Sequence, residues 1–166
     1  MADAPWLTIV GLGEDGPDGL TPASLKALGA AKTIVGPARH LGLLPQLDAD
    51  LVAWPVPFAD GLAILRRLAG TPTVALASGD PFWFGAGTGI AKEFAPQEWR
   101  ALPGLSVFSQ AAAHLGWQLE TTLCAGLHAA PFPRVRPHLS EAHRMIVTLR
   151  DGAAVAAFAA WLDGGG

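Results

Sequence analysis

The sequence predicts an α/β fold whose first hundred residues form a parallel sheet. Short apolar runs rich in β-formers alternate there with runs of helical character. Because parallel strands need a long crossover between them, this alternation is the pattern that such a sheet requires. A hydrophobic fraction of 51% in 166 residues is enough for a substantial core. We expect strands at 6–10, 32–36, 51–55 and 73–77, and helices at 22–30, 57–69 and from 90 onward.

Start and stop signals place two of these helices. Thr21 is a hydroxyl N-cap, and Pro22 suits the first helical position because its missing N–H is not needed there. The helix at 57–69 carries leucines at helical spacing and two outward arginines, and Gly70 ends it. Both segments therefore serve as crossovers between strands.

Residues 99–103 separate two stretches of different sequence character. We therefore expect an N-terminal α/β subdomain at 1–103 and a C-terminal one at 104–166. The second part opens with an alanine-rich helix that Gly116 closes. Its remaining elements are strands at 122–125 and 145–149, a proline-rich loop that holds Arg134, Arg136 and His138, and a helix at 153–162.

Charge and composition exclude several function classes. A net charge of −3 gives no basic field for nucleic acid. The single Cys124 and five scattered histidines predict neither a disulfide framework nor a metal site. Gly, Pro or charge interrupts each apolar stretch before it reaches membrane-spanning length. We therefore expect a cytoplasmic protein with no metal, no membrane and no nucleic-acid partner.

The loop after the strand at 73–77 is the first candidate for a ligand site. Loops at the carboxyl ends of parallel strands line the ligand crevice in open α/β sheets, and Ser78, Gly79 and Asp80 stand at such an end. Gly79 lets the backbone approach a ligand closely, and Asp80 offers a carboxylate. The aromatic and glycine-rich continuation favours a binding loop over a simple turn.

A second candidate is the loop Gly11-Leu12-Gly13-Glu14-Asp15-Gly16, which matches G-x-G-x-x-G after a strand. Its acidic residues would repel a pyrophosphate, and no helix opens at the third glycine. An NAD-dependent oxidoreductase therefore remains only an alternative. Arg39 and His40 follow the second strand, and Arg39 is suited to hold a carboxylate in bidentate geometry.

Four segments in order resemble one family. They are W-L-T-I-V-G-L-G-E-D-G at 6–16, G-P-A-R-H-L at 36–41, L-A-S-G-D-P-F-W-F-G at 76–85 and S-V-F-S-Q-A-A-A-H-L-G-W-Q-L at 106–119. Together they resemble the tetrapyrrole (corrin/porphyrin) methylases over nearly the whole chain. The resemblance implies two α/β subdomains with a ligand cleft between them, the second one truncated before the family's final strands.

The resemblance also implies the site and the reaction. S-adenosyl-L-methionine would transfer its methyl group to C5 of a precorrin in cobalamin biosynthesis, by positioning and without an assigned catalytic residue. The implied partners are a homodimer and, in the full-length enzyme, a C-terminal methyltransferase/decarboxylase domain. A non-catalytic tetrapyrrole-binding domain remains the other alternative. The implied cofactor contacts are Gly79, Asp80, Trp83, Ser106, Val107 and Leu127, and the implied substrate contacts are Leu12, Gly13, Arg39 and His40.

Overall fold

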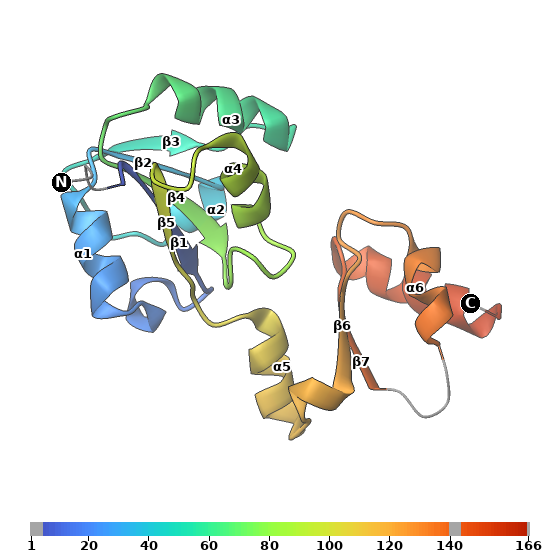
Figure 1. The fold of residues 1–166 in the computed structure, drawn as a ribbon. Helices are drawn as coiled ribbons and strands as arrows, with labels where there is room; N and C mark the ends of the chain where they lie inside the picture. The colour runs from blue at the N-terminus through green and yellow to red at the C-terminus, as the bar shows by residue number, and fades with distance from the viewer. Residues whose placement is uncertain (1–4, 140–143, 166) are drawn as a thin grey trace. The chain divides into compact units, whose positions relative to one another are not determined.

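The computed structural model describes residues 5–139 and 144–165, which form two compact units. The first ends at Ser106 and the second begins at Val107. The first unit is built on a parallel five-stranded sheet of order β3-β2-β4-β1-β5 (Figure 1), which confirms the predicted parallel sheet. Its strands are β1 (Leu7–Leu12), β2 (Thr33–Gly36), β3 (Asp50–Ala53), β4 (Thr73–Ser78) and β5 (Trp99–Leu102).

Helices supply the crossovers of this sheet, as the sequence predicts. The side chain of Thr21 accepts a hydrogen bond from the backbone N–H of Ser24, and the predicted N-cap is thereby confirmed. A short 3₁₀ helix, η1 (Gly16–Gly19), precedes the helix that Thr21 caps. The helices are α1 (Pro22–Ala30), α2 (Ala38–Leu41), α3 (Phe58–Arg67) and α4 (Gly87–Glu93).

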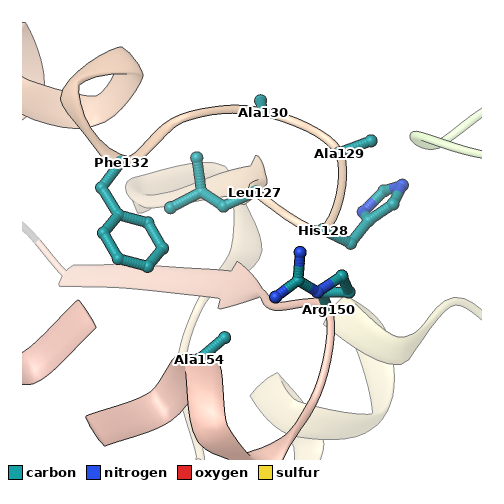
Figure 2. Close-up of a pocket in the computed structure, with 7 residues that line it drawn as sticks. All are labelled: Leu127, His128, Ala129, Ala130, Phe132, Arg150 and Ala154. Carbon is teal, nitrogen blue, oxygen red and sulfur yellow. The ribbon is translucent and has the colours of Figure 1, made fainter. Parts of the chain in front are cut away.

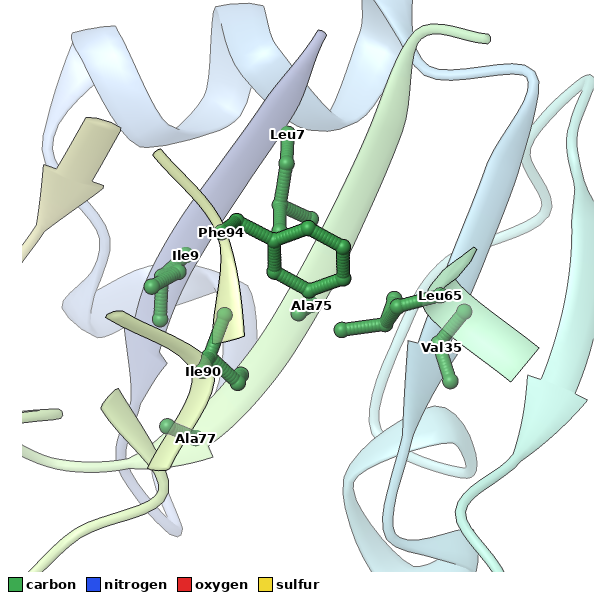
Figure 3. Packing of buried hydrophobic residues seen from close by; sticks show 8 residues of the cluster. All are labelled: Leu7, Ile9, Val35, Leu65, Ala75, Ala77, Ile90 and Phe94. Carbon is green, nitrogen blue, oxygen red and sulfur yellow. The ribbon is translucent and has the colours of Figure 1, made fainter. Parts of the chain in front are cut away.

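The central strands are buried on both faces. In β4, Val74 and Leu76 pack in one cluster with α1, while Ala75 and Ala77 pack in another with α3 and α4. Because side chains alternate between faces, a strand covered on both sides reads as one continuous apolar run. Figure 3 shows the second cluster, which contains Leu7, Ile9, Val35, Leu65, Ala75, Ala77, Ile90 and Phe94.

Two expectations about the chain's path are wrong. Residues 99–102, expected to lie at the boundary between the two parts of the chain, form β5 of the first unit, which pairs in parallel with β1. This edge strand carries Arg100, whose Nε donates to Thr8 Oγ1 at 3.1 Å, so its pattern lacks the apolar run of the inner strands. The segment with Arg134 and Arg136 is not an irregular loop but the 3₁₀ helix η3 (Phe132–His138).

The second unit holds a two-stranded parallel sheet. Its first helix ends where predicted, at Gly116, which has a φ of +64°. Phe132 packs edge-on against Phe158, with ring centroids 5.2 Å apart, and Phe158 stacks on Trp161. The elements are α5 (Val107–Leu115), the 3₁₀ helix η2 (Leu119–Thr121), β6 (Thr122–Gly126), η3, β7 (Arg144–Thr148) and α6 (Gly152–Asp163).

Candidate ligand sites at the strand ends

Three glycines meet where β1, β4 and β5 end. We call Gly11, Gly79 and Gly104 the glycine junction. The Gly79 N–H donates to the Leu12 carbonyl, and the Gly104 N–H donates to the Gly79 carbonyl, both at 3.0 Å. A Cβ at Gly11 would lie 1.8 Å from the Gly79 carbonyl oxygen. Main chain therefore packs directly on main chain here, which only glycine permits.

Gly79 begins the loop that the sequence singles out. Its φ is +52°, in the left-handed region, and a Cβ on it would lie 2.9 Å from the Leu105 carbonyl oxygen. A side chain is thus excluded by conformation and by space. The bare backbone of Gly79 is partly exposed, as close approach of a ligand would require.

Asp80 fixes the turn that follows. Its Oδ1 accepts a hydrogen bond from the Phe82 N–H at 2.8 Å, and its carbonyl accepts one from the Trp83 N–H at 3.2 Å. The Pro81 carbonyl accepts from the Gly87 N–H at 2.8 Å and ties the loop to α4. These bonds hold three consecutive exposed aromatic side chains, Phe82, Trp83 and Phe84, at the end of β4.

Arg39 lies beside the same strand end. It donates from Nη2 to Ser78 Oγ at 2.8 Å, and from Nη1 to a carboxylate oxygen of Glu14. Ser78 closes β4 and pairs with Leu12 of β1, and Glu14 follows Leu12 by two residues. The structure thus brings Arg39, Gly13 and the loop from Gly79 together at the carboxyl ends of β1, β2 and β4.

Two predicted substrate contacts have buried side chains. Leu12 lies in the core beside α1 and is 1% exposed, so only its main chain faces the loop. His40 is 0% exposed in α2, and neither ring nitrogen has a hydrogen-bond partner within residues 5–139 and 144–165. The family resemblance implies substrate contacts at both positions, but the structure places both side chains in the interior of the first unit. Their neighbours Gly13 and Arg39 remain accessible.

His40 should make stability depend on pH. Burial, reinforced by the positive charge of Arg39 and opposed by Glu14, holds the pKa of His40 below its ordinary value. Below about pH 6.5 the unfolded chain binds a proton at His40 that the folded chain does not bind. As the pH falls below this value, the free energy of unfolding therefore falls by up to about 1.4 kcal/mol per pH unit. Above pH 6.5 this contribution is flat. Urea unfolding of the parent and of His40→Leu between pH 5 and 8 measures it.

The matched control is His114→Gln, because His114 is exposed on α5. In this variant the free energy of unfolding should depend on pH as in the parent, whereas His40→Leu should lose the dependence below pH 6.5. Identical slopes for the parent and His40→Leu would contradict the assignment to the buried imidazole.

The second unit carries its own pocket, shown in Figure 2. It has a volume of about 360 Å³. His128 Nδ1 lies 3.2 Å from Thr148 Oγ1, and the Leu127 N–H donates to the Thr148 carbonyl at 2.8 Å. Both cationic and apolar groups therefore face one small space. Its lining residues are Leu127, His128, Ala129, Ala130, Phe132, Arg150 and Ala154.

Arg150 is a lining residue that the sequence analysis missed. It stands two residues after β7, and its Nε donates to Asp151 at 3.0 Å. The rule that ligand residues follow parallel strands, which selected Asp80, would also have selected it. Of the other predicted contacts, Ser106 is buried at the end of the first unit and Val107 is exposed at the start of the second.

Within the described ranges 5–139 and 144–165, no three His, Cys, Asp or Glu side chains are grouped so that they could hold an ion. No helix in those ranges has the length and apolar character needed to cross a membrane.

Comparison with known sequences decides the family. The family model named Tetrapyrrole (Corrin/Porphyrin) Methylases matches residues 6–163. The chain belongs to this family. The match spans both units and includes all four segments that carry the predicted resemblance.

Two curated relatives show which members of the family the chain is similar to. The decarboxylating precorrin-6Y C(5,15)-methyltransferase of Sinorhizobium sp is 38% identical over 90% of this chain and 37% of its own length. The cobalt-precorrin-7 C(5)-methyltransferase of Salmonella typhimurium is 32% identical over 66% of this chain and 55% of its own. Their names confirm the predicted likeness to the C5 methylases, although the chain spans well under two thirds of either.

A solved structure supports the predicted fold. The methyltransferase CobJ matches with a TM-score of 0.68 and 28% sequence identity, over 81% of this chain and 62% of CobJ. The predicted tetrapyrrole methylase fold is therefore confirmed.

Proposed function

We propose that this methylase binds S-adenosyl-L-methionine and transfers its methyl group to C5 of a precorrin in cobalamin biosynthesis. Membership of the family and the names of its two curated relatives support the reaction. The observation that carries the proposal in this chain is the loop from Gly79 to Trp83, which presents bare backbone, a carboxylate and aromatic rings at a strand end.

The residues present fit the cofactor. Gly79 leaves main chain uncovered where a Cβ would collide with Leu105, and Asp80 holds the turn that follows it. On this proposal Gly79, Asp80 and Trp83 contact the cofactor, and by family resemblance we propose Ser106, Val107 and Leu127 as further contacts. The sulfonium group, when bound, supplies an electrophilic methyl group.

The protein's own contribution is position. A meso carbon of the macrocycle is already nucleophilic, so we assign no general acid or base to this chain. Arg39 and Gly13 stand at the same edge of the sheet as the cofactor loop, where a cation can orient a substrate bearing carboxylates. Holding two reactants in line supplies much of the rate that such a reaction needs.

The proposal extends to the molecule's context. By family resemblance we propose a cytoplasmic homodimer, with the second methylation and decarboxylation carried by a further domain of the full-length enzyme; the chain covers 37% of the decarboxylating relative's length. An oxidoreductase is not favoured, because the matching family is one of methylases.

Calorimetric titration with S-adenosylhomocysteine tests the proposal. We expect the parent to bind, and Asp80→Ala to bind at least about tenfold more weakly, because it loses the oxygen that fixes the Phe82 N–H. Asp80→Asn keeps an acceptor oxygen and removes the charge, so it separates turn geometry from electrostatics.

Asp48→Asn is the control, since Asp48 is exposed in the segment before β3. It should bind like the parent. No heat from the parent at high micromolar ligand would sink the cofactor proposal. A parent that binds a porphyrin but not S-adenosylhomocysteine would favour the non-catalytic tetrapyrrole-binding alternative.

A further inference from the structure

The guanidinium of Arg39 already holds a carboxylate, and that carboxylate belongs to the protein. Nη1 donates to Glu14 and Nη2 donates to Ser78 Oγ at 2.8 Å. The proposed function requires the same group to hold a carboxylate of the substrate. Two carboxylates therefore compete for the Arg39 guanidinium: that of Glu14, in the loop after β1, and that of the ligand.

The two bonds of Arg39 differ in how they are anchored. Ser78 is the last residue of β4, and its backbone is held in register with β1, so the sheet positions the residue that carries this acceptor. Glu14 lies beyond the end of β1, outside any helix or strand, and its side chain is 76% exposed. The Glu14 bond can therefore break while the Ser78 bond keeps Arg39 at the strand end.

The ion pair is also open to solvent on both sides. The Arg39 side chain is 53% exposed, so an incoming anion can reach it without any rearrangement of the core. Exposed ion pairs contribute little net stability, because water solvates both charges well. A carboxylate on a macrocycle that is already bound by other contacts competes at high local concentration and can displace Glu14.

We propose that Glu14 is an internal competitor for Arg39, which a substrate carboxylate displaces on binding. This inference rests on the proposed function, in that Arg39 is the substrate's carboxylate site. It makes Glu14 a specificity-determining residue: a ligand without a carboxylate at this position leaves the internal pair closed and gains nothing from Arg39. The charge of Glu14 also repels carboxylates that do not reach Arg39.

The test uses uroporphyrin I, a tetrapyrrole with eight carboxylates, and follows its binding by quenching of tryptophan fluorescence at low and high salt. Glu14→Gln should bind it about threefold to tenfold more tightly than the parent, and the gain should shrink at high salt. Asp18→Asn removes one negative charge from the same loop, in η1, without touching Arg39, so it should bind like the parent. In an Arg39→Gln background, Glu14→Gln should give no gain.

Equal or weaker binding by Glu14→Gln would overturn the inference, as would equal gains from Glu14→Gln and Asp18→Asn or a gain that survives in Arg39→Gln. Binding by neither the parent nor Glu14→Gln would overturn it too. S-adenosylhomocysteine calorimetry on the same preparations keeps the two ideas apart. If the parent binds S-adenosylhomocysteine and Glu14→Gln has no effect on uroporphyrin binding, the cofactor proposal stands and the competitor role of Glu14 fails. If the parent does not bind S-adenosylhomocysteine but Glu14→Gln binds uroporphyrin more tightly, the cofactor proposal fails and the competitor role of Glu14 stands.

Discussion

Replacing Gly11 by alanine should lower the free energy of unfolding by about 3 kcal/mol. The added Cβ would lie 1.8 Å from the Gly79 carbonyl oxygen and 2.3 Å from the Gly104 nitrogen. Both are main-chain atoms of paired or tightly bonded segments, so neither can rotate away as a side chain would. Urea unfolding followed by circular dichroism measures the loss.

Gly29→Ala is the matched control for this substitution. Gly29 lies in α1, and a Cβ built on it meets no described atom within 4 Å beyond its own helix and chain neighbours. This control should unfold like the parent or gain about 0.5–1 kcal/mol, since alanine favours helix. A Gly11→Ala variant as stable as Gly29→Ala would show that the glycine junction can relax.

Replacing Gly79 by alanine should weaken S-adenosylhomocysteine binding by about tenfold or more. The left-handed φ of +52° costs an alanine about 1 kcal/mol, and its Cβ would press on the Leu105 carbonyl at 2.9 Å. Relief of that contact must move the loop by tenths of an ångström, and each 1.4 kcal/mol lost at the site is a factor of ten in affinity. Calorimetric titration gives the dissociation constant.

Gly70→Ala separates crowding at the site from the cost of the backbone conformation. Gly70 has a φ of +81°, but a Cβ there meets nothing among the described atoms within 4 Å. This variant should lose stability and keep the parent's affinity. If Gly79→Ala also bound like the parent, the loop would have no part in holding the cofactor.

The sequence predicts the sheet well because burial on both faces makes the inner strands uniform apolar runs. β1, β2 and β4 are all of this kind, and the crossover α1 announces itself through Thr21 and Pro22. β5 is not predicted, because it is an edge strand that is only partly buried and therefore lacks an apolar run. It is a four-residue edge strand between prolines, half-buried, with Arg100 in its middle, so neither a run nor a clean alternation marks it.

The site was predictable only where it depends on local chain direction. Gly79 and Asp80 stand directly after a strand and before an aromatic, glycine-rich stretch, and this local pattern marks them. The pairing of Arg39 with Glu14 joins positions 25 residues apart and depends on β1 and β2 both flanking β4, which no local pattern encodes. The burial of His40 likewise depends on how α2 packs, since an isolated four-residue helix has no face that its own sequence defines.

The glycine junction also determines how motion passes through the first unit. Where side chains separate two segments, rotamer changes absorb part of any displacement, but the Gly79 carbonyl and the Gly104 N–H touch with nothing between them. A shift of the loop at 79–83 must therefore either move Gly104, two residues before the last residue of the first unit, or break this hydrogen bond.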